Sequence, residues 1–332
     1  LGDLAAIGRT PGGGVCRLAA SHDDGLARDW FRARLGEEGL RVAVDAVGNV
    51  FGVAEMAGPD APLVLTGSHL DSQPSGGRYD GAYGVLAALE ALLAVRRRTA
   101  QGGGKPARNL GVVSWTNEEG ARFSPSTLGS AVFAGLVDAD FALSRADGDG
   151  VTLGAALADI GYRGADAPPR NVAAYVELHI EQGPELERAG STIGVVEGNW
   201  GTVKYVADIE GRAAHTGPTP MAARRDALLP AAELVLCCRQ MSDRTGGALV
   251  SSVGRLDVQP NSTNVVPGRV RLFAEFRALD PTMLADACAR FEAKGRALST
   301  EAVPVALTRT VDRPAGAFDA RLRDLIEDTA KT

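Results

Sequence analysis

The 332-residue sequence is short of histidine and cysteine, with four of each. The cysteines are too few and too irregularly spaced to show the C-x-x-C pattern of a zinc–thiolate site; they are Cys16, Cys237, Cys238 and Cys288. Two of them are adjacent, so the set does not indicate a disulfide framework either. We therefore expect a protein of the reducing cytoplasm.

Long apolar runs and an excess of positive charge are also missing. No apolar run reaches the roughly 20 residues that a membrane-spanning helix needs, so the sequence predicts no membrane partner. The formal net charge of −6 gives no sign of a nucleic-acid-binding surface, so we expect no nucleic-acid partner. What remains is the composition of an ordinary globular protein, with 45% hydrophobic and 23% charged residues.

At 332 residues the chain is longer than one hydrophobic core usually becomes, which predicts two domains. In the first part, periodicity predicts strands at 41–46, 50–54, 62–65, 110–116 and 173–180. It predicts helices at 17–40, 82–97, 127–135, 138–144 and 151–160. Because strands alternate with helices here, we expect an α/β domain with a mostly parallel sheet.

The pattern changes after residue 201. Strands are predicted at 202–209, 248–258, 269–278 and 303–310, with helices at 221–241 and 281–298. This order is that of a split βαβ, ferredoxin-like domain. A final helix at 320–330 is expected to return to the first domain. The sequence thus predicts a catalytic domain of residues 1–199 continued by 313–332, with residues 200–312 inserted as a second domain.

The segment 64–81, VLTGSHLDSQPSGGRYDG, contains a His and two Asp at the end of a predicted buried strand. His69 and Asp71 are two residues apart, so on an extended chain both side chains face the same way. Asp80 follows after a turn-forming Pro-Ser-Gly-Gly. Ligand sites of open α/β sheets lie at the carboxyl ends of strands, which favours a metal site. The alternative is that the aspartates are turn and cap residues.

Two further strand ends carry possible ligands. Glu118 and Glu119 follow the predicted strand 110–116, and burying both without a cation would be costly. The alternative is an exposed acidic turn. His179 lies on the predicted strand 173–180, with Glu177 and Glu181 on the same face. It is either a core histidine or a metal ligand, and its place beside two other such strand ends favours a ligand.

Seven ordered motifs together resemble one family over essentially the whole chain. They are GSHLDS at 67–72, GGRYDG at 76–81, TNEEGARF at 116–123, ELHIEQGP at 177–184, AAHTGPTPMAARRDA at 213–227, PNSTNVVPG at 260–268 and EFRALD at 275–280. The family is the amidase, or hydantoinase/carbamoylase, branch of the M20 metallopeptidase-like proteins. It includes N-carbamoyl-L-amino-acid hydrolases, allantoate amidohydrolase and β-ureidopropionase. The resemblance implies a zinc-peptidase-like catalytic domain with a mixed sheet, and an inserted ferredoxin-like α+β lid that dimerises.

The resemblance implies two divalent metal ions, Zn²⁺ or Mn²⁺, with Ni²⁺ or Co²⁺ also possible. His69 and His179 would bind one ion, Glu119 the other, and Asp80 would bridge them. The family completes its second ion with a histidine near the C-terminus. This sequence has no histidine after His215, so the second site lacks that ligand here and we expect the natural chain to be longer.

The family's catalytic roles carry over residue by residue. Glu118 would be the general base, which takes a proton from the bridging water and gives it to the leaving nitrogen. Asp71 would orient His69 from behind the metal. His215 would come from the partner subunit and polarise the scissile carbonyl.

Three more residues would bind substrate by the same resemblance. Arg277 would hold the substrate carboxylate with a bidentate guanidinium, and Gln182 and Asn264 would form hydrogen bonds with the substrate. The structural alternatives are a surface ion pair for Arg277, a turn residue for Asn264 and a loop residue for His215.

The expected activity is therefore hydrolysis of a C–N bond in an N-carbamoyl-L-amino acid or related ureido acid, with release of ammonia and carbon dioxide. The expected partners are a small-molecule carboxylate substrate and a second copy of the chain. Three alternatives stay open at this point: an allantoate amidohydrolase, a dipeptidase or aminoacylase of the same superfamily, and a metal-poor binding homologue.

Overall fold

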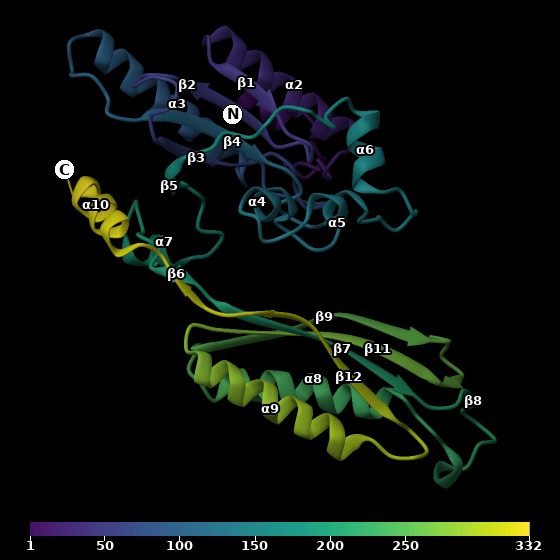
Figure 1. Ribbon diagram of the computed structural model, residues 1–332. Helices are drawn as coiled ribbons and strands as arrows, with labels where there is room; N and C mark the ends of the chain where they lie inside the picture. Colours follow the sequence, from purple (N-terminus) through teal and green to yellow (C-terminus); the bar gives the residue numbers. More distant parts are fainter. Residues whose placement is uncertain (332) are drawn as a thin grey trace. The chain divides into compact units, whose positions relative to one another are not determined.

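The structure is a computed structural model that describes residues 1–331 (Figure 1). The chain divides into two compact units, of which unit 1 is Leu1–Glu185 and unit 2 begins at Leu186. The predicted boundary at 199/200, and the predicted return of helix 320–330 to the first domain, stay predictions.

Unit 1 is built on a five-stranded sheet in the order β1-β2-β4-β3-β5 (Figure 1). The strands are β1 (Arg41–Val44), β2 (Val50–Ala54), β3 (Leu63–His69), β4 (Asn109–Trp115) and β5 (Val172–Val176). Strand β3 pairs in parallel with β4 and β5, whereas β1–β2 and β2–β4 are antiparallel. The expectation of a mostly parallel sheet is thus wrong, because β1 and β2 form a hairpin whose second strand pairs antiparallel with β4. The mixed sheet is the arrangement that the family resemblance implies.

The helices of unit 1 are α1 (Gly2–Ala6), α2 (His22–Glu37), α3 (Ala82–Ala100), α4 (Leu128–Phe133), α5 (Ala139–Leu143) and α6 (Leu153–Asp159). The predicted helix 17–40 therefore begins five residues later than expected, at His22. Ser21 caps it by accepting a hydrogen bond from the N–H of Asp24. The residues before the cap are not helical: Val15 forms a β-bridge with Gly76, and Ala20 lies in a turn with a φ of 53°.

The sheet of unit 1 is covered on both faces by apolar side chains. Phe31 and Leu35 of α2 belong to one cluster with residues of α3 and with Val112 of β4. A second cluster joins Phe51 and Trp115 with Phe133 of α4. Because apolar side chains fill both faces of the sheet, the ends of its strands are the places left for polar side chains.

Unit 2 contains a four-stranded antiparallel sheet in the order β12-β7-β11-β9. Its strands are β7 (Gly201–Glu210), β9 (Leu249–Gln259), β11 (Arg269–Ala278) and β12 (Val305–Arg313). Helices α8 (Leu228–Asp243) and α9 (Pro281–Leu298) lie on one face of the sheet (Figure 1). The order of these six elements along the chain follows the predicted strand–helix–strand–strand–helix–strand pattern.

Helix α8 begins seven residues later than the predicted start at 221. The residues in between first form a short 3₁₀ turn at Met221–Ala223, and Arg225 then forms a β-bridge with Arg212, which keeps the backbone extended. The core of unit 2 packs Leu234 of α8 and Phe291 of α9 against the inner face of the sheet.

Short elements complete the described chain. They are β8 (Ala214–His215) paired with β10 (Val265–Val266), β6 (Gly198–Asn199) paired with β13 (Gly316–Ala317), α7 (Glu185–Ala189) and α10 (Ala320–Ala330). Within residues 1–331, none of the helices is at once long enough and apolar enough to span a lipid bilayer.

Candidate metal centre

Two glycines let the chain close tightly around His69, the last residue of β3. A Cβ atom at Gly81 would lie 2.4 Å from the carbonyl oxygen of His69 and 2.6 Å from its imidazole ring. Gly81 also has a φ of 62°, in the left-handed region that favours glycine. At Gly67 a Cβ atom would come within 2.0 Å of the carbonyl oxygen of Val113 on β4. The backbone therefore approaches His69 and β4 more closely than any side chain at these two positions would allow.

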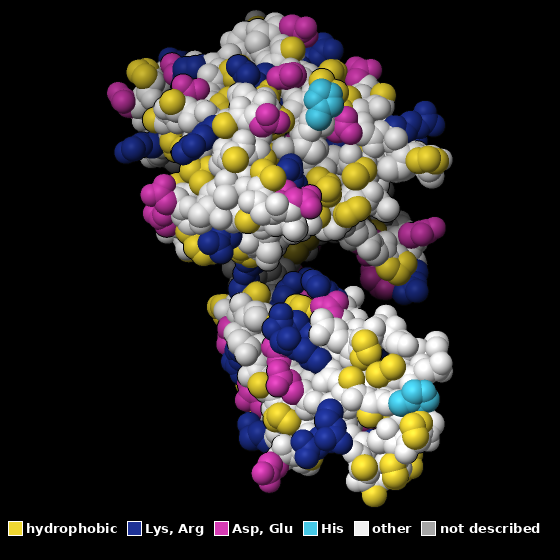
Figure 2. Space-filling view, turned by 90° about the vertical axis from the view of Figure 1, so that its right-hand side faces the viewer, with side chains coloured by type: hydrophobic (Ala, Val, Ile, Leu, Met, Phe, Trp, Pro, Cys, Tyr) yellow, Lys and Arg dark blue, Asp and Glu magenta, His cyan; other side chains and the backbone are white. Residues whose placement is uncertain are grey.

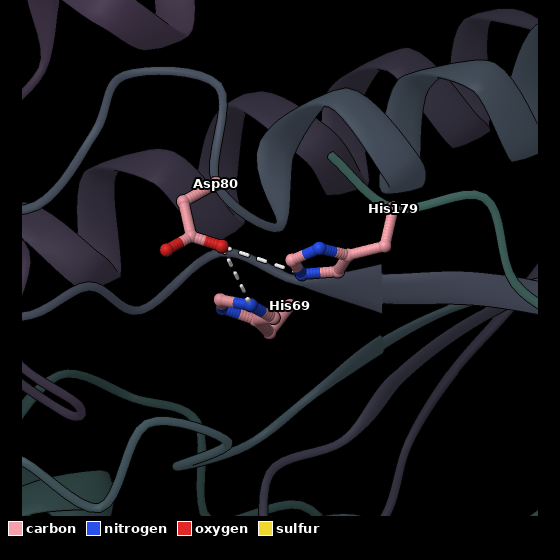
Figure 3. Close-up of side chains that lie close together, drawn as sticks. All are labelled: His69, Asp80 and His179. Carbon is pink, nitrogen blue, oxygen red and sulfur yellow. Dashed lines mark ion pairs between the residues drawn. The ribbon is translucent and has the colours of Figure 1, made fainter. Parts of the chain in front are cut away.

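Three of the four predicted metal ligands meet at this point (Figure 3). The Nε2 atom of His69 lies 3.6 Å from Oδ1 of Asp80, and Nε2 of His179 lies 3.3 Å from the same oxygen. One ligand atom from each residue lies within 4.8 Å of the others, close enough to surround a single ion. His69 and Asp80 are buried, whereas the side chain of His179 is 32% exposed.

His179 does not lie in a strand. Strand β5 ends at Val176, so the predicted strand 173–180 is wrong at its C-terminal end. Beyond Val176 the backbone leaves the sheet, and this departure is what brings the imidazole of His179 to Asp80 (Figure 3).

Asp71 connects the histidine loop to the acidic loop after β4. Its carboxylate accepts hydrogen bonds from the backbone N–H of Glu118, at 3.1 Å, and of Glu119, at 3.2 Å. Its main-chain carbonyl oxygen, rather than its carboxylate, lies 2.8 Å from Nδ1 of His69. Asp71 thus fixes the acidic loop with its side chain and the His69 ring with its backbone.

Glu118 and Glu119 are both half-buried at the end of this loop. Oε2 of Glu118 lies 3.6 Å from Nε2 of His69, which places this carboxylate beside the cluster. Oε2 of Glu119 accepts a hydrogen bond of 2.9 Å from Gln73, while its Oε1 is buried and has no hydrogen-bond partner among the described residues. The alternative of a fully exposed acidic turn is therefore not what the chain forms.

Asn49, which is not among the predicted site residues, supports the same loop with its buried amide. Asn49 is fully buried, its Oδ1 accepts from the N–H of Thr116 at 2.9 Å, and its Nδ2 donates to the carbonyl of Gly129 at 3.0 Å. The dipeptide Gly48-Asn49 predicts a turn but not the distant residues it contacts, which depend on how β2, β4 and α4 assemble.

Arg17, also missed, holds the other side of the site. It is completely buried, its Nε donates to the carbonyl of Leu70 at 2.9 Å, and its backbone N–H donates to Oγ of Ser72 at 2.8 Å. An arginine expected inside a helix gave no signal of this contact. The non-helical segment before α2 therefore binds the residues on both sides of Asp71 through Arg17.

The protonation states around the cluster are strongly perturbed. Burial opposes a charge on His69, but the contact with Asp80 and the charges of Asp71 and Glu118 raise the pKa of this ring to about 10. Asp80 likewise raises the pKa of His179, and its contacts with the two rings hold the pKa of Asp80 well below its usual range. The protons on the two rings thus balance the carboxylates where no metal cation does so.

Burial has the opposite effect on the two neighbouring acids. It raises the pKa of Asp71 to about 6, despite the charge on His69. Burial also raises the pKa of Glu118, with Glu119 and Glu177 adding to the increase against the charge on His69. A carboxyl group whose pKa moves toward neutrality suits proton transfer at working pH.

The residues present fit divalent metal ions. Two imidazoles and a carboxylate form a donor set that suits zinc or manganese, and an ion there would replace the two ring protons, so that metal binding releases protons. The orphaned Oε1 of Glu119 is a buried carboxylate oxygen that lacks a partner among residues 1–331, as expected of a ligand atom for a neighbouring ion.

The predicted substrate residues lie in both units. Gln182, in unit 1, donates a hydrogen bond of 2.6 Å from Nε2 to Oδ2 of Asp80. In unit 2, His215 and Asn264 are brought together, because His215 pairs with Val265 and the carbonyl of Asn264 accepts from the N–H of Thr216 at 3.0 Å. Arg277 lies elsewhere in unit 2, near the C-terminal end of β11.

Curated relatives resemble most of this chain. A putative hydrolase of Mycolicibacterium smegmatis is 48% identical over 86% of this chain and 66% of its own length. The N-carbamoyl-L-amino acid amidohydrolase of Geobacillus stearothermophilus is 39% identical over 83% of this chain and 68% of its own length. The chain thus spans about two thirds of the length of these relatives.

Among solved structures, an amidase of the hydantoinase/carbamoylase family from Burkholderia vietnamiensis superposes with a TM-score of 0.89 and 42% identity, covering 99% of this chain and 79% of that one. The sequence model of the family described as peptidase family M20/M25/M40 matches residues 65–332 of this chain, and this range includes His69, Asp80 and His179. Family model, relatives and fold agree with a site of two histidines and acidic residues at the strand ends, and the chain belongs to peptidase family M20/M25/M40.

Proposed function

We propose that this chain is a metal-dependent amidohydrolase that cleaves the C–N bond of an N-carbamoyl-L-amino acid or a related ureido acid. The observation that carries the proposal is the cluster of His69, Asp80 and His179, which could hold a metal ion, with Glu118 beside it, 3.6 Å from His69. A protein that only binds its ligand needs no general base at this place. The substrate class comes from the relative named N-carbamoyl-L-amino acid amidohydrolase.

The cofactors of this proposal are two divalent ions, Zn²⁺ or Mn²⁺. When bound, they polarise the scissile carbonyl and lower the pKa of the attacking water. His69, Asp80 and His179 would hold the first ion, and the buried Oε1 of Glu119, which has no hydrogen-bond partner among residues 1–331, would be a ligand of the second.

The side chains then have separate tasks in the reaction. Glu118 accepts a proton from the water that adds to the carbamoyl carbon, and returns it to the leaving nitrogen as the C–N bond breaks. The carbamic acid formed in this step then breaks its remaining C–N bond and gives carbon dioxide and an amine. One ureido acid and one water thus give ammonia, carbon dioxide and the free amino acid. Asp71 keeps the Glu118 loop in place, because its carboxylate accepts hydrogen bonds from two backbone N–H groups of that loop.

Arg277 is our proposed anchor for the carboxylate of the substrate. Its side chain is 50% exposed, and its Nε contacts Glu275. The two Nη nitrogens have no partner among residues 1–331, so the guanidinium can present them together to a carboxylate. Glu275 is shared with Lys204 at 2.8 Å, which leaves one positive charge in excess at this place. Gln182 and Asn264 are proposed to bind the remaining polar groups of the substrate.

His215 is suited to stabilise an oxyanion. Its Nδ1 accepts a hydrogen bond of 3.0 Å from the N–H of Gly217. In a neutral imidazole the other nitrogen then carries the proton, so Nε2–H is a donor. A donor aimed at a carbonyl oxygen that becomes negative is the requirement for this kind of catalysis.

In unit 2, Arg277 lies too far from His215 and Asn264 for all three residues of one chain to contact one small substrate. His215 and Asn264 lie beyond the start of β11, where Arg269 pairs with Glu210, whereas Arg277 lies eight residues further along the strand. Eight residues of a strand span about 26 Å at roughly 3.3 Å each. We therefore propose that a second copy of the chain supplies His215 and Asn264 to the site, as a homodimer.

Strand β9 is the proposed contact between the copies. It pairs with β11 on one side, and no strand pairs with its other edge among residues 1–331. Val250 and Leu256 on β9 are each 42% exposed, and Leu229 and Leu236 on α8 are 63% and 58% exposed. An edge strand beside exposed apolar side chains can pair with its own symmetry copy.

Mixing two inactive variants tests the shared site. His215→Ala and Glu118→Gln chains each lack one group, and a hybrid dimer contains one site with both groups intact. Random exchange gives half hybrids with one of two sites restored, so about a quarter of wild-type activity is expected for a symmetric dimer. Absence of recovery after demonstrated subunit exchange would place His215 in its own chain's site.

The activity itself is tested by ammonia release with added Mn²⁺ or Zn²⁺. We expect ammonia from N-carbamoyl-L-amino acids, with allantoate as a second substrate. Dipeptides are a third substrate class, and their cleavage is followed by the newly formed free amino groups because it releases no ammonia. Faster cleavage of dipeptides would favour the dipeptidase alternative. If metal binds but none of the substrates is hydrolysed, the chain is a binding homologue.

A further inference from the structure

The two histidines of the ligand cluster lie beyond the last backbone pairing between β3 and β5. Strands β3 and β5 pair in parallel as far as Thr66 and Val176. His69 and His179 each follow three residues later, and yet their Nε2 atoms converge on one oxygen of Asp80. Because the ladder has already ended, some other interaction must hold the two chain segments in register.

A chain of side-chain hydrogen bonds begins where the ladder stops. Oγ of Ser68 donates to Oε1 of Glu177 at 2.6 Å, and the hydroxyl of Tyr175 donates to Oε2 of Glu177 at 2.6 Å. Nε1 of Trp115 donates in turn to the Tyr175 hydroxyl at 2.9 Å. Trp115 is the β4 residue opposite His69, so the chain of bonds crosses β4, β5 and the end of β3.

We propose that Glu177 is a positioning residue of the metal centre, which sets the distance between His69 and His179 by tying Ser68 to the segment after β5. This inference rests on the metal site of the proposed function, but not on the substrate. Ser68 directly precedes His69, and Glu177 lies two residues before His179. A shift at Glu177 therefore moves one imidazole relative to the other.

The chemistry of the group suits this role. A carboxylate is acceptor-only, so it can receive one bond from each neighbour with both of its oxygens. Both bonds to Glu177 are short, as expected for hydrogen bonds to a charged acceptor. Burial and the charge of Glu177 raise the pKa of Tyr175, so its hydroxyl stays a donor at any working pH. With its two oxygens taken, Glu177 is not part of the ligand cluster.

The hydrogen bonds of Glu177 matter for the segment after β5 because that strand has few other backbone contacts to hold it. Strand β5 is an edge of the five-stranded sheet among the described residues, so it is paired on one side alone. The side chain of Ser68 is fully buried, whereas Tyr175 is 37% exposed. The segment after Val176 is thus fastened to the buried end of β3 by Glu177.

The test measures metal affinity of the metal-free protein, together with its unfolding temperature. Wild type, Glu177→Gln, Tyr175→Phe and the double variant are titrated with Zn²⁺ and with Mn²⁺. We expect the dissociation constant of the first ion to rise by roughly 10- to 100-fold in Glu177→Gln, the range for residues that support metal ligands. Tyr175→Phe should give a smaller rise. The double variant should show less than the product of the two single effects, because both side chains act largely through the carboxylate of Glu177; the Tyr175 hydroxyl also lies 3.1 Å from the carbonyl oxygen of Gly67.

Tyr205→Phe is the matched control. Tyr205 donates to Oε1 of Glu292 at 2.6 Å, the same bond type and length, but in unit 2 and with a ring only 2% exposed. If metal affinity merely followed stability, this variant should weaken metal binding at least as much as Tyr175→Phe. We expect its metal affinity to equal that of wild type, even where its unfolding temperature falls more.

Two outcomes overturn different statements. If wild type binds no divalent ion, the metal site of the proposed function falls. If wild type binds the ion and Glu177→Gln binds it equally well, Glu177 does not position the histidines. Tyr175→Phe keeps the ring in a half-exposed position, so it reports on the bridge even if Glu177→Gln fails to fold.

Discussion

Units 1 and 2 differ in what they bury. Among residues 1–331, all the buried charged residues, amides, histidines, serines and threonines belong to unit 1. They are Arg17, Asp24, Arg28, Asp45, Asn49, Ser68, His69, Asp71, Ser72, Asp80, Asn109, Ser114, Thr116 and Asn117. Most of them surround the loops that carry the metal ligands. A buried polar group is tolerated when it is hydrogen-bonded, and otherwise costs about 1–3 kcal/mol.

Unit 2 keeps its charges on the surface. Arg271 pairs with Asp208 at 2.8 Å and Lys204 with Glu275 at 2.8 Å; the two basic side chains are exposed, and the two acidic ones are half-buried. Figure 2 shows acidic and basic side chains close together on the surface of this unit. The difference teaches that the part of the chain with the chemistry depends on matched buried partners, whereas the sheet and helices of unit 2 depend on apolar packing.

The largest expected effect comes from Asp80→Ala, which removes the carboxylate shared by both histidines. We expect metal content to fall sharply, and turnover to fall by more than the roughly 10⁴-fold upper range for loss of a general base. Metal per chain is measured after dialysis, alongside ammonia release, with the exposed acid of Asp286→Ala in unit 2 as the control. Unchanged metal stoichiometry would contradict the shared role of Asp80.

Glu118→Gln should come next, because it removes proton transfer but leaves the ligand cluster in place. We expect kcat to fall by about 10²- to 10⁴-fold, with metal content and KM close to wild type. Steady-state kinetics and metal analysis of the same sample separate these quantities. A kcat near wild type would mean that another group is the base.

A pair of arginine variants sharpens the contrast between buried and exposed charge. Arg28 donates to Asp24 at 2.8 Å with both side chains buried, so Arg28→Met leaves a buried carboxylate unpaired and should destabilise by about 3–5 kcal/mol. Arg271→Met breaks an exposed pair and should change stability by about 0–1 kcal/mol. Denaturant unfolding followed separately for each unit gives both values. Equal losses would show that the two units treat charge alike.

Arg277→Lys should have the smallest effect, and it is confined to one class of substrate. A single ammonium cannot reproduce the planar fork of the guanidinium. Loss of one strong hydrogen bond to a charged group corresponds to about 10- to 100-fold in kcat/KM. The loss should nearly vanish when wild type and variant are compared on substrates whose carboxylate is amidated. Equal loss on both classes would make Arg277 a structural residue.

The sequence was sufficient to predict a strand before His69 and a strand before Glu118 and Glu119, because apolar runs followed by polar residues are local patterns. It also predicted the order of elements in unit 2, where alternation and helical periodicity are clear. His179 was predicted on a strand, but the strand ends before it, because nothing in the local pattern shows where pairing with β3 stops.

The supporting contacts could not be predicted, because they join residues far apart in the chain. Arg17 contacts Leu70, Asn49 contacts Thr116, and Glu177 contacts Ser68, 109 positions away. Each residue type is common in helices, turns or strands, so its local context suggests an ordinary structural role. Its actual role depends on the register of strands that only the assembled sheet determines.

Gly67 and Gly81 also limit which positions can change when the substrate specificity of the protein changes. In a random library, variants at either position are expected to be eliminated, since any side chain meets the Val113 carbonyl or the His69 ring. Gly77, in the same loop, has 4.0 Å of room to the nearest side chain and should accept substitution. Selection for a different substrate is therefore expected to leave these two codons unchanged and to enrich changes around Arg277 on β11, where the side chain is exposed.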